Sequence, residues 1–324
     1  MQKKSLMILF LSLTATIIII AACRQRSMAG AAGEEWYLPT EDKSCELYLY
    51  EIGAGEPVVV VHGGFGAEHS YLLDAIKGLE NCYRFILYDQ RGSLRSPCKP
   101  EFISIEKHVQ DLESLRRELK LEKMTLLAHS AGTLLVMFYL QKYPQRVQNI
   151  VFLGPVVPKA GKYLDRSEVA VIKDSQAAFE KFVERPEAKA EYKKEGIDQP
   201  NKNAKQLTHL FKISFAAGNI YHVERWAQMK GGKVFWSQEA AQATSKSLPS
   251  DYDFTPTLKQ HPYPITIIAG DHDVADFGNR LWKKVVAGIN NMELMIIENA
   301  GHNSWIDEPD IFNKALKRAL AKKL

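Results

Sequence analysis

The sequence predicts an α/β protein in which a mostly parallel β-sheet is flanked by helices and interrupted by a helical insertion. Three observations predict this class. Continuous β-branched runs such as PVVVVHGG indicate strands that are buried on both faces. Segments with helical spacing alternate with these runs, and βαβα order is typical of a parallel sheet. The strand pattern stops near Pro155 and returns about a hundred residues later.

The first half of the chain contains most of the expected strands. CELYLYEIG alternates apolar and polar residues, as a half-buried strand does. Buried strands are expected at PVVVVHGG, RFILYDQRG, MTLLAHS and VQNIVFLGP. Helices are expected at residues 104–120, where charges lie opposite the apolar positions, and at 131–143, which is apolar nearly all round and therefore buried.

The insertion is expected over residues 156–262, where charged amphipathic patterns replace the buried strands. Strands return with PITIIAGDHD and MELMIIENAGH, and DEPDIFNKALKRAL predicts a closing helix. One α/β domain is therefore expected in two parts, residues 41–155 and 263–324, with the insertion as a helical cap domain.

The N-terminus is expected to be a targeting segment. A positive MQKK start precedes an apolar run to Ala22, so residues 1–22 are interpreted as a signal peptide. The following IAAC resembles the lipobox of bacterial lipoproteins, which implies acylation of Cys23 and anchoring to a membrane of the bacterial cell envelope. Residues 23–40 are then expected to be a tether. A plain signal peptide or a retained membrane anchor is the alternative.

Charge and cysteine content narrow the function classes. The net charge is +4, and it falls to +2 without Lys3 and Lys4, so nucleic acid is not an expected partner. Three cysteines follow Cys23, at positions 45, 82 and 98. They cannot all pair with one another, which leaves one disulfide with a free thiol or three free thiols.

Ser130 is the candidate nucleophile. It stands in AHSAG between an expected buried strand and an expected buried helix, the context of a nucleophile elbow. Small neighbours are required there because the turn is strained and tightly packed. Ala128 occupies a position where glycine is usual. The alternative is an ordinary serine at the start of a helix.

Two backbone N–H groups are candidates for an oxyanion hole. VVHGGFG ends an earlier buried strand, with His62 and Gly63 as structural support for a glycine turn. The N–H groups of Gly64 and of Ala131, the residue after the candidate nucleophile, would hold the negative oxygen of a tetrahedral intermediate. A simple tight turn is the alternative.

His302 is the candidate general base because it follows the last strand in a glycine-containing loop. Its orienting acid is Asp273 or Asp271. Asp273 is preferred because this loop resembles those of hydrolases that usually carry the acid three positions after the glycine, here Gly270. The order serine, acid, histidine predicts a catalytic triad. No metal site and no cofactor is expected, since GDHD alone is weak as a ligand set.

These motifs resemble the α/β-hydrolases, and most closely the proline iminopeptidase family. HGGFG is similar to that family's HGGPG, with Phe65 in place of proline. YDQRGSLRS is similar to its DQRG-S/C-G-RS, with Leu94 where glycine is usual. The resemblance covers residues 45–155 and 263–324. It implies an α/β-hydrolase fold and a structural loop whose arginine, here Arg91, supports the oxyanion loop by hydrogen bonds.

The resemblance also implies that carboxylates of the cap bind a substrate ammonium, because a buried charge needs a partner. Glu224 near Trp226 is the first candidate and Glu239 the next, although neither matches the family residue for residue. The cap's aromatic residues are candidates for lining a pocket or for packing its helices. They are Phe211, Phe215, Tyr221, Trp226, Phe235 and Trp236.

The predicted function is a serine hydrolase working by acyl transfer, most similar to a proline iminopeptidase that acts on short peptides. A carboxylesterase or lactonase acting on small neutral esters is the alternative with the same machinery. An alternative of another class is a non-catalytic, lipid-anchored binding protein.

Overall fold

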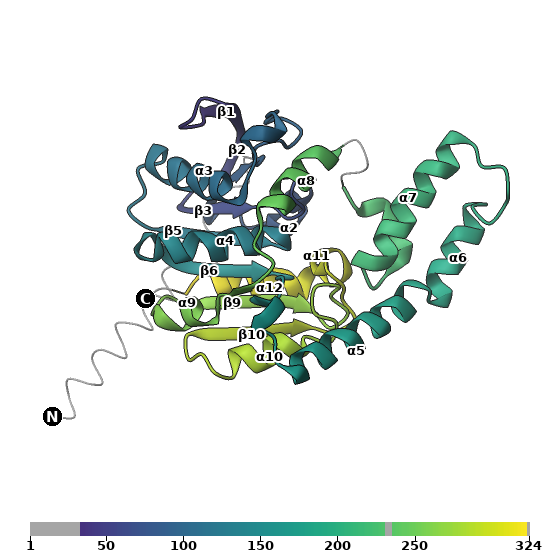
Figure 1. Cartoon of the computed structure of the whole chain (residues 1–324). Coiled ribbons are helices and arrows are strands. Elements are labelled where there is room, and N and C mark those ends of the chain that lie inside the picture. Colours follow the sequence, from purple (N-terminus) through teal and green to yellow (C-terminus); the bar gives the residue numbers. More distant parts are fainter. Residues whose placement is uncertain (1–32, 231–234, 323–324) are drawn as a thin grey trace.

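The computed structural model describes residues 33–230 and 235–322 (Figure 1). The predicted signal peptide and Cys23 lie outside these residues. An eight-stranded sheet forms the centre, in the order β1-β2-β4-β3-β5-β6-β9-β10. Strand β2 is antiparallel to both neighbours, and all other pairs are parallel. The predicted fold class, a mostly parallel sheet flanked by helices, is confirmed.

The strands of this sheet are β1 (Glu34–Pro39), β2 (Glu46–Gly53), β3 (Glu56–Val61), β4 (Tyr83–Tyr88), β5 (Met124–His129), β6 (Val147–Leu153), β9 (Ile265–Gly270) and β10 (Met292–Ile297). A small ribbon pairs β7 (Lys159–Ala160) with β8 (Tyr252–Asp253). The α-helices are α2 (Leu73–Ile76), α3 (Ile105–Glu118), α4 (Ala131–Lys142), α5 (Arg166–Val183), α6 (Pro186–Lys194), α7 (Ala204–Asn219), α8 (Gln238–Ser247), α9 (Thr255–Gln260), α10 (Arg280–Val286), α11 (Ser304–Asp307) and α12 (Pro309–Leu320). The short 3-10 helices are η1 (Ser70–Leu72), η2 (Pro100–Phe102), η3 (Pro144–Arg146), η4 (Gly161–Tyr163) and η5 (Val223–Gln228).

Two hydrophobic layers cover the sheet, one on each face. Alternation along β3 sends Val59 and Val61 into the layer that contains α3, α4 and α9. Val58 and Val60 enter the opposite layer, which contains α2, α11 and α12. Both faces of the central strands are therefore buried, which explains their continuous β-branched sequences.

Strand β1 corrects the predicted tether. Residues 34–39 fall within the range 23–40, but they pair with β2 and extend the sheet at its edge. Leu38 is buried in the core, and the Trp36 indole N–H donates to Glu51 at 2.9 Å. A strand with only alternate residues facing inward has a weak hydrophobic signal, which explains why the sequence pattern was insufficient here.

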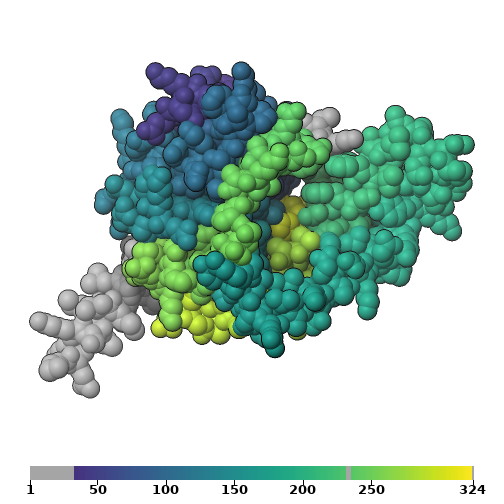
Figure 2. All heavy atoms as spheres, in the orientation of Figure 1, coloured from purple at the N-terminus to yellow at the C-terminus, as the bar shows by residue number. Residues whose placement is uncertain are grey.

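Helices α5 to α8 all lie within the range 156–262 that was expected to form a cap. Figure 1 shows α6 and α7 projecting away from the sheet, and Figure 2 shows a hollow between this arm and the body. Capping boxes begin two of the helices, with Asp165 and Glu168 on α5 and Asn203 and Gln206 on α7. The Arg185 guanidinium links α5 to α7, since it donates to four backbone carbonyls of α5, α7 and the segment that follows α7.

Within residues 33–230 and 235–322, none of the helices combines the length and the apolar character that crossing a membrane requires.

Candidate active site

Ser130 lies on a strained turn between β5 and α4. Its backbone has φ +53° and ψ −126°, a conformation that residues other than glycine rarely adopt. Its N–H donates to Leu153 on the neighbouring strand β6, and its carbonyl accepts from the Thr133 hydroxyl at 2.6 Å. Hydrogen bonds on both sides therefore hold the strained conformation.

Small residues around this turn are required by close backbone approaches. A Cβ on Gly132 would lie 2.5 Å from the His62 carbonyl oxygen, and one on Gly63 would lie 2.6 Å from Cβ of Ser130. Ala128, where glycine is usual, is fully buried in β5 and packs in the core. Its methyl group is part of the hydrophobic layer that contains α3 and α4.

The glycine loop after β3 lies beside this serine. Gly64 has a positive φ of 66°, and its carbonyl accepts from the Ala67 N–H in a tight turn. Among the described residues, the N–H groups of Gly64 and Ala131 donate to no protein group. These two predicted oxyanion donors are therefore both available to a ligand.

His302 and Asp273 form a direct pair at the ends of β9 and β10. Nδ1 of His302 lies 2.7 Å from Oδ1 of Asp273, and both side chains are buried. Gly154, at the end of β6, makes room for them, since a Cβ there would lie 2.6 Å from Oδ2 of Asp273 and 2.8 Å from Nδ1 of His302. Asp271 instead contacts His272 at 2.7 Å and accepts from the Ala300 N–H.

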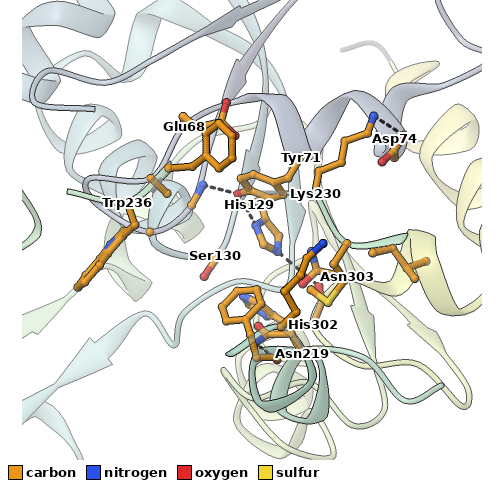
Figure 3. Close-up of a pocket in the computed structure, with 18 of the residues that line it drawn as sticks. Glu68, Tyr71, Asp74, His129, Ser130, Asn219, Lys230, Trp236, His302 and Asn303 are labelled. Atoms are coloured by element: carbon orange, nitrogen blue, oxygen red, sulfur yellow. Dashed lines mark hydrogen bonds and ion pairs between the residues drawn. The ribbon is translucent and has the colours of Figure 1, made fainter. Parts of the chain in front are cut away.

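Ser130 and His302 line one cavity (Figure 3). Within the described part of the chain, the Ser130 hydroxyl makes no hydrogen bond to the His302 ring. Hydrogen bonds between nucleophile and base are often long without substrate and shorten in the complex. The structure thus brings the three residues to one edge of the sheet, with the acid–base pair already formed.

A tyrosine–histidine network beside Ser130 was not predicted. The Gly63 N–H donates to the Tyr71 hydroxyl at 2.7 Å, and that hydroxyl lies 2.8 Å from Nδ1 of His129. Burial, and next the neighbouring His302, hold the pKa of His129 well below its usual value. The His129 ring is therefore neutral, accepting from Tyr71 and directing its Nε2 toward the His302 carbonyl oxygen 3.4 Å away. The only sequence feature that pointed to His129 was its position next to Ser130. No sequence feature pointed to Tyr71.

Gln90 connects the predicted support loop to the glycine loop. Its side-chain amide donates to the His62 carbonyl at 2.8 Å, and its backbone N–H donates to the His62 ring at 3.0 Å. Arg91 is fully buried but bonds elsewhere, to Asp111 in a bidentate pair and to the Phe102 carbonyl. The implied role of Arg91 as a direct hydrogen-bonding support of the oxyanion loop is corrected accordingly, because its guanidinium points toward α3.

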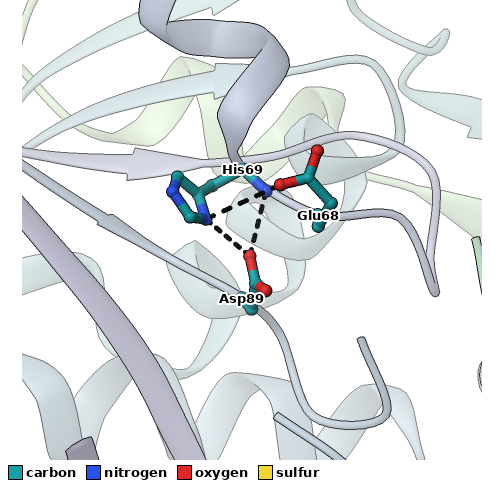
Figure 4. Close-up of side chains that lie close together, drawn as sticks. All are labelled: Glu68, His69 and Asp89. Atoms are coloured by element: carbon teal, nitrogen blue, oxygen red, sulfur yellow. Dashed lines mark hydrogen bonds and ion pairs between the residues drawn. The ribbon is translucent and has the colours of Figure 1, made fainter. Parts of the chain in front are cut away.

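A buried ionic cluster of Glu68, His69 and Asp89 holds the segment that follows the glycine loop (Figure 4). Oδ1 of Asp89 accepts from the His69 backbone N–H at 3.0 Å and lies 2.6 Å from the His69 ring. The Arg95 guanidinium contacts Glu68 at 3.0 Å and Asp89 at 3.4 Å. Burial would raise the pKa of Asp89, but the His69 hydrogen bond and the neighbouring histidines outweigh it and lower that pKa. Each carboxylate is already paired, so this cluster serves as a structural network.

The cavity has a volume of about 590 Å³ and a largely aromatic wall. Phe211 and Phe215 reach it from α7, and Phe235 and Trp236 reach it from the segment before α8. Tyr221 and Trp226 do not line it. Of the predicted aromatic set, four members therefore border the cavity and two pack the arm.

The charged residues lining the cavity differ from those predicted. Among the described residues, they are Glu68, Asp74, Lys212 and Lys230. Asp74 on α2 pairs with Lys230 at 2.8 Å, and both side chains are partly exposed. Lys212 has no carboxylate partner among the described residues, whereas Glu68 is neutralised by Arg95.

Glu224, Trp226 and Glu239 do not line the cavity, which corrects their predicted place at the substrate. Glu224 is half-exposed and pairs with His222 at 3.3 Å. The Trp226 indole N–H donates to Glu191 at 3.0 Å inside the arm. Glu239 is exposed in the first turn of α8. Their orientation depends on how the arm docks on the body, which helical spacing alone does not specify.

Comparison with known proteins agrees with this geometry. A family model for the alpha/beta hydrolase fold matches residues 56–309. A proline iminopeptidase from Lactobacillus acidophilus is 26% identical over 289 residues, covering 82% of this chain and 89% of that protein. One from Saccharolobus solfataricus is 25% identical over 283 residues, covering 83% and 86%.

Solved structures share the fold. The proline iminopeptidase-related protein from Thermus thermophilus has a TM-score of 0.60 at 24% identity, covering 90% of this chain and 98% of that one. An esterase from Exiguobacterium antarcticum has a TM-score of 0.62 at 19% identity, covering 89% and 100%. The chain therefore belongs to the α/β-hydrolase fold family, as a hydrolase close to the proline iminopeptidases.

Proposed function

We propose that the protein is a serine hydrolase that works by acyl transfer, with Ser130 as nucleophile, His302 as general base and Asp273 as the acid that orients it. The single observation that carries the proposal is the strained Ser130 opening on the same cavity as a preformed His302–Asp273 pair. Strain at a serine between a strand and a helix is typical of nucleophile elbows.

The proposed reaction is a series of proton transfers through His302 that accompany attack by Ser130 on the substrate. His302 takes the hydroxyl proton as Oγ of Ser130 attacks the substrate carbonyl carbon. The N–H groups of Gly64 and Ala131 stabilise the negative carbonyl oxygen. The histidine then protonates the leaving amine or alcohol as its bond to the carbonyl breaks. Water attacks the acyl-enzyme by the same path in reverse, releasing the acid and restoring Ser130.

The first candidate substrate class is the N-terminal residue of short peptides. It is supported by the proline iminopeptidase relatives, which cover most of the chain. Such a substrate carries an ammonium that needs a carboxylate. Asp74 is the accessible candidate, because it lines the cavity and its partner Lys230 is partly exposed and replaceable. Glu68 is less available, since Ser70 and Arg95 already occupy its oxygens.

A small neutral carboxylic ester is the second candidate, and one observation favours it. Both carboxylates that line the cavity already have cationic partners, whereas Lys212 has no carboxylate partner in the described residues. A cavity with this charge balance and aromatic walls suits a substrate without an ammonium.

Turnover of prolyl and alanyl arylamides should be compared with turnover of short-chain aryl esters. Ser130→Ala is expected to abolish both, and Asp74→Asn is expected to lower only arylamide turnover, by about ten-fold or more. Glu224→Gln is the matched control, because this carboxylate lies outside the cavity. Ester turnover alone from the unmutated protein would contradict the aminopeptidase assignment and support the esterase.

The non-catalytic alternative is tested by a fluorophosphonate probe, which reacts with activated serines. Labelling of Ser130 in the folded protein is expected, and its loss in His302→Ala would support activation by the base. An unlabelled Ser130 together with no turnover of amide or ester would favour a binding protein instead.

Lipid anchoring at Cys23 is a further part of the proposal, supported by the IAAC pattern. Metabolic labelling with an alkyne-tagged fatty acid in a bacterial host is expected to mark the protein. The label should disappear in Cys23→Ala. An unlabelled but exported protein would favour a plain signal peptide.

A further inference from the structure

Two thiols outside the proposed catalytic site lie next to each other. Cys45 immediately precedes β2, and Cys98 lies in the loop between β4 and η2. We propose that Cys45 and Cys98 are an oxidisable dithiol, which a small-molecule disulfide such as oxidised glutathione converts into one intramolecular disulfide. This proposal does not depend on the proposed hydrolase chemistry.

The contacts around the sulfur atoms place the two thiols together. The Ser44 hydroxyl oxygen lies 4.0 Å from Sγ of Cys45 and 3.9 Å from Sγ of Cys98. One hydroxyl group therefore lies within 4.0 Å of both sulfur atoms. Both are free and only half-buried, so a small reagent can reach them.

The two backbone segments are fixed relative to each other. The Tyr48 N–H, on β2, donates to the Ser96 hydroxyl at 2.8 Å, and that hydroxyl donates to the Asp89 carbonyl at 2.8 Å. The Cys45 carbonyl accepts from the Thr40 N–H at 3.0 Å in the turn that precedes β2. Both segments are therefore held in place on either side of the Ser44 hydroxyl, which keeps the two thiols in one region of the fold.

The two thiols differ in pKa because their surroundings differ. The neighbouring Cys45 thiol and then the Ser44 hydroxyl, with the positive charge of Arg91, lower the pKa of Cys98 to about 7 although burial opposes this. The neighbouring Cys98 thiol and burial raise the pKa of Cys45. Cys98 is therefore the attacking thiol and Cys45 the thiol that completes the bond.

The chemistry balances with glutathione as the oxidant. The Cys98 thiolate attacks one sulfur of oxidised glutathione, forming a mixed disulfide and expelling one glutathione thiolate. Cys45 then loses its proton and attacks the Cys98 sulfur, expelling the second glutathione. Two cysteine thiols are oxidised, and one glutathione disulfide is reduced to two thiols.

The test is oxidation of the folded, full-length protein by oxidised glutathione, followed by non-reducing digestion and mass spectrometry. A peptide pair joined through Cys45 and Cys98 is expected, with a thermal midpoint several degrees higher than in the reduced protein. Cys45→Ser is expected to accumulate glutathione on Cys98. In Cys98→Ser, Cys45 is expected to react about ten-fold more slowly.

Three results would overturn the proposal. They are two thiols that stay free under conditions in which a surface thiol reacts, separate glutathione adducts on Cys45 and Cys98 without a cross-link, and a cross-link from either residue to a different cysteine. A Cys98→Ser variant whose Cys45 reacts as fast as Cys98 would overturn the assignment of the attacking thiol.

Discussion

The Tyr71 hydroxyl links the glycine loop to His129, the residue before Ser130, and lies 2.7 Å from the Gly63 nitrogen and 2.8 Å from Nδ1 of His129. Since Gly63 donates to it, the tyrosine has its proton free for His129, whose Nε2 faces the His302 carbonyl. One hydroxyl thus holds together the loop that bears the Gly64 N–H and the residue next to Ser130.

Tyr71→Phe is expected to lower kcat for any turned-over substrate by about ten-fold or more, because Gly63 and His129 lose their shared partner. It also leaves a buried N–H unpaired, which costs about 1–3 kcal/mol of unfolding free energy. Steady-state kinetics and urea unfolding measure the two effects.

Tyr88→Phe is the matched control for this variant. The Tyr88 hydroxyl is buried and has no hydrogen-bond partner among the described residues. Its removal should leave activity and stability unchanged or slightly improved. Unchanged activity and stability in Tyr71→Phe, as in the control, would show that Tyr71 contributes only by filling space.

Asp273→Asn is expected to reduce kcat by about 10³ to 10⁴, because the amide no longer holds the His302 tautomer that accepts a proton from Ser130. Asp271→Asn should retain activity within a few-fold, since Asp271 contacts His272 and the Ala300 N–H instead. Fluorophosphonate labelling rates measure both without a known substrate. A larger loss in Asp271→Asn would exchange the roles of the two carboxylates.

The parts of the site that lie at strand ends could be predicted from sequence. Parallel strands end at one edge of the sheet, so candidates after β5, β9 and β10 were expected to meet there, and Asp273 and His302 do. The cavity wall could not be predicted in this way. Tyr71 and Asp74 come from the short helices η1 and α2, which have no periodic signal in the sequence. Trp236 reaches the glycine loop only because the chain returns from the arm. Such contacts depend on tertiary docking, which local patterns do not encode.

Gly154→Ala is expected to abolish labelling of Ser130 while the protein remains folded. The added Cβ would lie within 3 Å of both Asp273 and His302, so their pair must separate. Gly78→Ala is the control, because Gly78 also has a positive φ, of 86°, but the added Cβ would make only an ordinary contact with Nδ2 of Asn313 at 3.9 Å. Each substitution costs about 1–2 kcal/mol of backbone strain, whereas only Gly154→Ala should affect activity. Unchanged labelling of Ser130 in Gly154→Ala would mean that the Asp273–His302 pair can shift without loss of activity.

The pH dependence of stability should contain a contribution from Asp276. Burial raises its pKa to about 6, and this outweighs the backbone N–H groups of Trp282 and Leu281 that hydrogen-bond to its carboxylate. Its folded pKa lies above the unfolded value near 3.8, so the folded state binds the proton more tightly between these pH values. The contribution of Asp276 to the free energy of unfolding is therefore greatest below about pH 4. It decreases by about 3 kcal/mol as the pH rises through 6.

Asp276→Asn keeps an oxygen acceptor for both N–H groups and removes the titration. Urea unfolding of both proteins at about pH 4.5 and about pH 7.5 measures the effect. The variant's stability relative to the unmutated protein should be greater at the higher pH, because there the unmutated protein buries a charge. A relative stability that does not change between the two pH values would show that this carboxylate titrates alike in the folded and unfolded chains.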